Sequence, residues 1–123
     1  MTVTYDTGAL IAAERNERRM WARHRALLES GAAITVPTPV IAQAWRGGTR
    51  QASLARLLAG CTSEPLDGVQ ARRIGVLARR TGHSDVVDLA VAEGALRRGD
   101  VVVTSDPDDL AAAGVRPANV ERA

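Results

Sequence analysis

A short run of β-branched residues that ends in acid constrains this chain more than any other stretch. Val101–Thr104 is three valines and a threonine, which is typical of a strand buried on both faces of a sheet. Pro107 ends the run soon afterwards, because proline disfavours helix for the residue before it and favours the first position of a helix or turn. Asp106 therefore lies at the carboxyl end of a strand. In open parallel α/β sheets the ligand crevice lies outside these ends, so Asp106 is a candidate site residue.

The same pattern opens the chain. Thr2–Tyr5 is β-branched and aromatic and predicts a second strand, and Asp6 follows it directly. The alanine-rich stretch Ala9–Ala13 then begins a helix. N-capping of that helix would by itself explain an aspartate at this point, so both interpretations of Asp6 stay open. Ala33–Val36, closed by a proline, predicts a third strand.

Helical segments separate these strands along the chain. Helix caps, apolar spacing and terminal glycines predict helices over Asn16–Ser30, Thr38–Arg46, Arg50–Leu58, Asp67–Gly82, Ser84–Arg98 and Asp108–Ala113. Two weaker strands are expected at Cys61–Leu66, confined to a sheet edge by its proline, and at Val115–Val120. This alternation predicts one domain over residues 1–123, with an α/β fold: a three-layer α/β/α sandwich around a parallel sheet of four to five strands.

Composition sets further expectations. A chain of 123 residues can bury a core without disulfides, and Cys61, the one cysteine, is expected to be a small core residue. Trp45 is also expected in the core, with stacking on a base as the alternative. His24 is expected to be partly exposed and His83 to lie in a loop, and neither has a partner at ligand spacing, so a histidine metal site is not expected. With no leader and no membrane-length apolar run, we expect a cytoplasmic protein without membrane contact.

The net charge of +2 conceals a segregation of charge along the chain. Twelve of the 16 arginines lie between Arg15 and Arg80, whereas seven of the 14 acids lie between Asp85 and Asp109. A basic surface beside an acidic focus suits an enzyme that holds a polyanion and uses a cation, although ordinary solvated helix faces would give the same counts. The arginines predicted to contact the phosphates of such a polyanion are Arg46, Arg50, Arg72, Arg73, Arg79, Arg80 and those of the segment Arg15–Arg25.

Aspartates from three elements are expected at one edge of the sheet. They are Asp6, Asp88 with Asp85, and Asp106 with Asp109. Capping explains each alone but does not predict that they gather. Clustered aspartates repel one another and raise one another's pKa unless a cation neutralises them. Oxygen ligands without histidine or cysteine favour Mg²⁺ or Mn²⁺, and the chemistry that fits is phosphodiester hydrolysis by a metal-activated water.

Three segments, in this order and spacing, resemble the PIN domains, and most closely the VapC-type ribonuclease toxins of bacterial toxin–antitoxin pairs: Tyr5–Ala9, Ser84–Ala90 and Val103–Leu110. Each motif is short and unspecific alone, but together they span nearly the whole chain. The resemblance implies a Mg²⁺-dependent endoribonuclease, a homodimer, and inhibition by a small VapB-like antitoxin bound over the site.

The resemblance also assigns roles to residues. It implies that Asp6, Asp88 and Asp106 are the catalytic, metal-binding carboxylates. It implies an accessory role for the nearby acids and hydroxyls, which are Asp85, Asp109, Thr104 and Ser105.

Gln43 departs from the family pattern. PIN domains usually carry a glutamate on the helix after the second strand, and here that position holds an amide, which can orient a water or a ligand but brings no charge to a cation. We therefore expect weak Mg²⁺ binding, some preference for Mn²⁺, and low ribonuclease activity that Gln43→Glu increases. The alternative is a catalytically weakened PIN-fold module that binds RNA or a protein partner.

Two other classes of protein with similar sheets are excluded. A response-regulator receiver needs a lysine in its site, and this chain has no lysine. A dinucleotide-binding domain needs a glycine-rich G-x-G-x-x-G turn after the first strand, and none is present.

Overall fold

The computed structural model describes all 123 residues and contains one sheet of five strands, in which every neighbouring pair is parallel. The strand order is β3-β2-β1-β4-β5, so the first strand of the chain lies at the centre. The strands are β1 (Thr2–Tyr5), β2 (Ala33–Pro37), β3 (Thr62–Glu64), β4 (Val101–Thr104) and β5 (Val120–Arg122). The central strand therefore pairs with residues from both halves of the chain: Val3 lies opposite Ile34 on one side and Val101 on the other.

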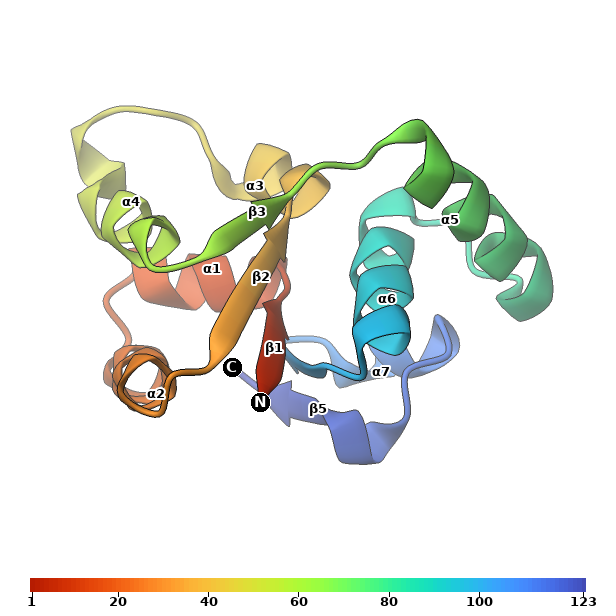
Figure 1. Cartoon of the computed structure of the whole chain (residues 1–123). Coiled ribbons are helices and arrows are strands. Elements are labelled where there is room, and N and C mark those ends of the chain that lie inside the picture. Colours follow the sequence, from red (N-terminus) through yellow and green to blue (C-terminus); the bar gives the residue numbers. More distant parts are fainter.

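Helices cover both faces of this sheet (Figure 1). They are α1 (Thr7–Glu14), α2 (Arg18–Glu29), α3 (Thr38–Ala44), α4 (Ala52–Ala59), α5 (Gly68–Thr81), α6 (Val86–Arg98) and α7 (Pro107–Ala112), with 3-10 turns η1 (Thr49–Gln51) and η2 (Pro117–Asn119). The layer of α1, α2 and α4 packs on one face, and α6, with α5 against it, packs on the other. The predicted three-layer α/β/α sandwich with a parallel sheet is confirmed.

Alternate residues of β1 face opposite helical layers, as the two-residue period of a strand requires. Tyr5 is fully buried, and its hydroxyl lies 2.9 Å from Nδ1 of His24 on α2. Thr4 is also fully buried but faces the other layer, where its hydroxyl accepts a hydrogen bond from Arg98, the last residue of α6. Asp6 is the next residue on the Thr4 side, so the strand directs this aspartate toward α6.

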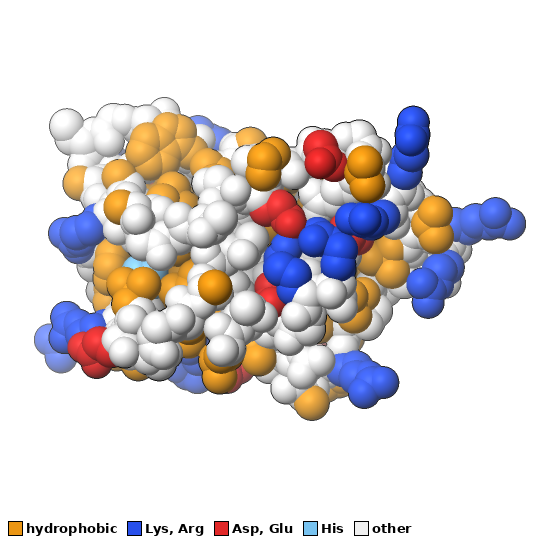
Figure 2. Space-filling model, viewed as in Figure 1, with side chains coloured by type: hydrophobic (Ala, Val, Ile, Leu, Met, Phe, Trp, Pro, Cys, Tyr) orange, Lys and Arg blue, Asp and Glu red, His pale blue; other side chains and the backbone are white.

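Ion pairs fasten the C-terminal end of α6 to the sheet. Arg98 donates to Asp100 Oδ2 at 2.8 Å and to Glu64 Oε2, at the end of β3, at 2.6 Å. Arg97 reaches the same Glu64 oxygen at 3.0 Å and also binds Glu93. We call these five residues the arginine clamp, and Figure 2 shows basic and acidic side chains in contact at the middle of this face. The clamp fixes the orientation of α6, and with it the position of the helix's first turn.

Two of the clamp's three carboxylates, Glu64 and Asp100, differ in their surroundings. Burial favours a higher pKa for Glu64, but the hydrogen bonds from Arg97 and Arg98 outweigh it and hold the pKa of Glu64 below its usual value. Asp100 is 2% exposed and uses Oδ2 to accept from both Arg98 and Thr4, while its Oδ1 is buried without a hydrogen-bond partner. The negative charge of Asp100 therefore depends on Arg98 for its neutralisation.

Two predictions about single side chains are wrong. Trp45 is 40% exposed, because the extended backbone that ends α3 carries its side chain out of the core. His24 is 3% exposed rather than at the surface. The Tyr5 hydroxyl satisfies its Nδ1, and the edge of Trp21 packs against its ring, so the buried imidazole has a polar partner and close packing.

The last strand is shorter and later than predicted. Val115 does not begin it: the side chain is 3% exposed and belongs to the hydrophobic core. The turn η2 follows, and pairing with β4 starts only at Val120. The weak strand expected within Cys61–Leu66 forms β3 and does lie at the sheet edge, as its proline predicted. Cys61 is half-buried against the core just before that strand.

Candidate active site

Asp6 occupies the centre of the sheet's carboxyl edge. It follows β1, caps α1 and is 6% exposed. Its Oδ1 accepts a hydrogen bond from the backbone N–H of Thr7 at 2.7 Å, and its Oδ2 accepts one from the hydroxyl of Thr104 at 2.8 Å. Because β1 and β4 are paired, the residues that follow them are neighbours, and Thr104 holds Asp6 across that pairing.

Other acids act on Asp6. Burial is the main cause that raises the pKa of Asp6 above its usual value, and the negative charges of Asp88 and Asp85 raise it further. The hydrogen bonds from Thr104 and Thr7 oppose this shift but do not cancel it. The first turn of α6 therefore lies close enough to Asp6 for carboxylates on the two elements to repel one another.

Asp85 and Asp88 begin α6. Asp85 is its N-cap, and the Asp85 side chain accepts a hydrogen bond from the Asp88 backbone N–H at 3.0 Å. The Asp88 carboxylate is bound in turn by His83, whose Nε2 lies 2.9 Å from Oδ2. The sequence alone would allow helix capping to explain both acids. In the structure capping accounts for the side chain of Asp85 but not for that of Asp88.

Asp106 and Asp109 follow β4. Asp106 caps α7 by accepting from the backbone N–H of Asp109 at 3.3 Å, and its own N–H donates to the Thr104 hydroxyl at 3.0 Å. A hydrogen bond with the Asp106 carboxyl group raises the pKa of Asp109, and the charges of Asp106 and Asp88 act in the same direction. We call Asp6, Asp85, Asp88, Asp106 and Asp109 the acid cluster.

Thr104 links two members of the acid cluster. Its side chain is fully buried, its hydroxyl donates to Asp6, and the same oxygen accepts from the Asp106 backbone. Ser105, predicted to act beside it, is placed differently. A Cβ atom on Gly8 would lie 2.0 Å from the Ser105 Oγ and 2.6 Å from its backbone nitrogen, so only glycine lets α1 approach β4 this closely. The Ser105 hydroxyl lies against Gly8 and makes no hydrogen bond to the acids.

Gln43 lies at the margin of the acid cluster. Its Oε1 accepts a hydrogen bond from the Thr7 hydroxyl, and Thr7 is the residue whose backbone binds Asp6. The side chain is exposed. The helix after the second strand therefore does bring an amide beside Asp6.

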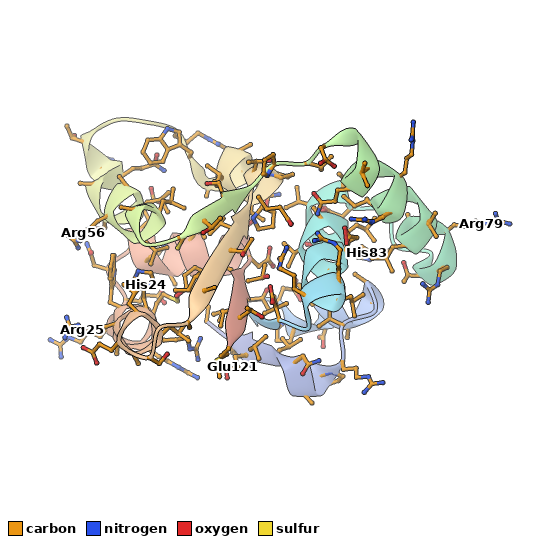
Figure 3. All side chains as sticks on the ribbon, viewed as in Figure 1. His24, Arg25, Arg56, Arg79, His83 and Glu121 are labelled. Atoms are coloured by element: carbon orange, nitrogen blue, oxygen red, sulfur yellow. The ribbon has the colours of Figure 1, made fainter.

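Four of the predicted RNA-binding arginines lie in two regions: Arg46 and Arg50 follow α3, and Arg72 and Arg79 lie on α5. Arg46 turns back on the end of α3 and donates to the carbonyl groups of Ala42 and Trp45. Arg50, Arg72 and Arg79 are exposed and form no ion pair. Arg79 points away from α5 into solvent (Figure 3), and Arg72 borders a groove of about 530 Å³ between α5 and α6.

Residues 3–115 match the PIN domain family. The chain belongs to that family. This PIN domain is also similar to a chain in the crystal structure of VapBC2 from Rickettsia felis bound to a DNA fragment from their promoter. The TM-score is 0.77 and the identity 15%, and the match covers 100% of this chain and 99% of that chain. At that identity the likeness shows a shared fold. No curated protein matches the sequence.

The donor set of this PIN domain suits a divalent cation, but the side chains are not gathered around one point. No group of three or more His, Cys, Asp or Glu side chains is arranged to hold a metal ion. Burial is the main cause of the raised pKa of Asp6, and a hydrogen bond with Asp106 is the main cause of that of Asp109, but the charges of neighbouring acids raise both pKa values further. Hard oxygen donors that repel one another are what Mg²⁺ or Mn²⁺ would neutralise. Sharing of one ion by Asp6, Asp88 and Asp106 stays a prediction.

Sequence reasoning missed His83. It lies in the loop between α5 and α6, as expected, but the contact of its ring with the Asp88 carboxylate was not predicted. A usable signal was present: only Ser84 separates His83 from the cap of α6, so a histidine there cannot be far from the helix's first turn. No helix of this PIN domain combines the length and apolar character needed to cross a membrane.

Proposed function

We propose that this PIN domain is a metal-dependent endoribonuclease of the VapC toxin type. The acid cluster carries the proposal: β1, α6 and the segment after β4 bring aspartates within range of one another's charge. Membership of the PIN family supports nuclease activity, and the similar structure from Rickettsia felis is that of VapBC2 bound to a DNA fragment from their promoter.

Asp6, Asp88 and Asp106 would hold the cation, Mg²⁺ or Mn²⁺. Thr104 restrains Asp6 through a side-chain hydrogen bond and Asp106 through its backbone. The bound cation supplies activation of a water molecule and stabilisation of the leaving oxygen of the phosphodiester. Asp85 and Asp109 act as accessory acids, because each lies three residues from a proposed ligand and adds charge to the same cluster.

The RNA substrate would be held by arginines through its phosphates. Arg50, Arg72 and Arg79 support this role because they are exposed and their charges are not paired within the chain. Arg46 keeps its charge while donating only to carbonyl groups, so it too can face a phosphate. A small VapB-like antitoxin is the proposed inhibitor, and a homodimer is the proposed assembly.

A second candidate function is a PIN-fold module that binds RNA or a protein partner without cutting. Gln43 favours it, because the side chain next to the acid cluster is a neutral amide hydrogen-bonded to Thr7 rather than a fourth carboxylate. Weak neutralisation of the cation's charge would lower the metal affinity of the site.

Cleavage of a mixed RNA pool in Mg²⁺ or Mn²⁺ separates the two functions. We expect slow cleavage by the wild type that EDTA stops and that Asp6→Asn abolishes. Asp67→Asn is the matched control, because Asp67 also caps a helix through its side chain, asparagine caps about as well as aspartate, and the residue lies outside the acid cluster. RNA binding without cleavage by the wild type would establish the binding module instead.

A further inference from the structure

One side chain outside the family's acidic motifs contacts the acid cluster directly. Nε2 of His83 lies 2.9 Å from Oδ2 of Asp88, and each side chain is 18% exposed. Figure 3 places His83 beside α6, whereas Arg79 of the same segment points into solvent. The contact is therefore a sheltered hydrogen bond at the edge of the proposed site.

The end of α5 fixes the position of His83. Gly82 ends the helix in the left-handed region, with φ of 74°, and turns the chain back toward α6. The backbone N–H of His83 donates to the Thr81 hydroxyl at 3.2 Å, and that hydroxyl donates to the Leu77 carbonyl at 2.8 Å. His83 is thus tied to the last turn of a 14-residue helix and is not a loose loop residue.

Asp88 is held at two points. Its backbone N–H binds the Asp85 cap, and its Oδ2 binds His83. Its Oδ1 accepts no hydrogen bond from the protein. A carboxylate restrained through one oxygen keeps the other in a defined direction, which is the arrangement that outer partners give to metal-binding side chains.

We propose that His83 is a positioning residue, which holds the Asp88 carboxylate through Oδ2 and leaves Oδ1 available to the cation. The inference rests on the proposed function, since it assigns Asp88 to the cation. It requires only that Nε2 carries a hydrogen to donate, which both the imidazolium and one neutral tautomer provide.

Two substitutions separate the hydrogen bond from the bulk of the ring. His83→Gln keeps an N–H donor the same number of bonds from the backbone as Nε2, whereas His83→Phe keeps a ring and loses the donor. Mn²⁺ alone is the probe, and its binding is followed by loss of the free-ion signal in electron paramagnetic resonance. We expect His83→Phe to weaken Mn²⁺ binding by about 10- to 100-fold and His83→Gln to stay within a few-fold of the wild type.

Kinetics and a double-mutant cycle complete the test. His83→Phe should lower kcat at saturating Mn²⁺ while the KM for RNA stays unchanged, because the arginines that hold RNA are untouched. In an Asp88→Asn background, His83→Phe should have no further effect on Mn²⁺ binding, since the partner oxygen has been replaced. Thermal unfolding of each variant without metal shows whether a loss comes from misfolding.

The outcomes distinguish this inference from the proposed function. Unchanged Mn²⁺ binding in His83→Phe, or equal losses in the Phe and Gln variants, would overturn the positioning role even if Asp6→Asn still abolished cleavage. A wild type whose Mn²⁺ binding depends on His83 and Asp88 as expected but which cuts no RNA would overturn the proposed function and uphold the positioning role. A wild type that binds no Mn²⁺ would overturn both.

Discussion

Gln43 is the single residue that most limits the charge of the acid cluster. Its amide accepts from the Thr7 hydroxyl, and a glutamate could make the same contact while adding a negative charge beside Asp6. We therefore expect Gln43→Glu to raise both metal affinity and cleavage rate, on the order of tenfold or about 1.4 kcal/mol. Mg²⁺ and Mn²⁺ are titrated against cleavage for both forms at one pH. Equal affinity and rate in the two forms would place Gln43 outside the metal shell.

The raised pKa of Asp6 makes the stability of the folded protein depend on pH, and the direction of that dependence can be predicted. The pKa of Asp6 in the folded protein is raised, mainly by burial, so its ionised form is less favourable there than in the unfolded chain. The stability it contributes is complete below the unfolded pKa of about 3.9 and is lost as pH rises through the folded pKa. In EDTA, the unfolding free energy of the wild type should therefore fall relative to that of Asp6→Asn as the pH rises above about 4. Urea unfolding at a series of pH values tests this, and a constant difference would contradict it.

Residue by residue, the site was predictable where backbone topology determines position. Asp6 and Asp106 follow neighbouring parallel strands, so their place at one edge follows from the sheet alone. His83, His24 and Trp45 were not predictable in this way. Their environments depend on how a helix ends or on which way the helix is rotated about its axis. Neither feature can be predicted from the hydrophobicity of a single residue.

Among the elements, α6 is the one whose orientation the site depends on most. Its first turn carries Asp85 and Asp88, and its last turn is held by the arginine clamp. Two strands form where they were predicted, at Thr2–Tyr5 and Val101–Thr104. They were predictable because runs of β-branched residues suit a sheet that is covered by helices on both faces. The clamp was not predictable, because Glu64, Arg98 and Asp100 are brought together only by the crossing of α6 over the sheet.

Loss of Arg98 should destabilise the fold far more than loss of an arginine whose acidic partner is exposed. The Asp100 side chain is 0% exposed, and Arg98→Ala leaves it with the Thr4 hydroxyl but without a cation. We expect a loss of about 3 kcal/mol, in the range for breaking a buried pair. Arg23→Ala is the control: the carboxylate that it leaves behind, Glu121, has a side chain 55% exposed, so solvent screening should limit the loss to about 1 kcal/mol. Urea unfolding at neutral pH measures both, and equal losses would contradict the assignment of the clamp.

Across the whole molecule, basic residues outnumber acids away from the acid cluster. If Arg50, Arg72 and Arg79 contact phosphates, replacing all three by alanine should weaken RNA binding and reduce the slope of log affinity against log salt by about 2, since each contact on a single strand contributes about 0.7. Binding is measured in the Asp6→Asn form so that RNA is not cut. Arg116→Ala, outside the predicted set, is the control. An unchanged slope in the triple variant would mean that these arginines belong to a solvated face.

The central position of β1 has a consequence for how the protein is made. The hydrogen bond from Thr104 to Asp6 joins residues 98 positions apart, and β1 cannot gain its second neighbour before β4 has been synthesised. Contacts of such long range form late and slow folding. A nascent chain that lacks β4 therefore has neither a complete sheet nor an assembled acid cluster. If the domain cuts RNA, it is harmless to the ribosome until nearly all of it has been translated.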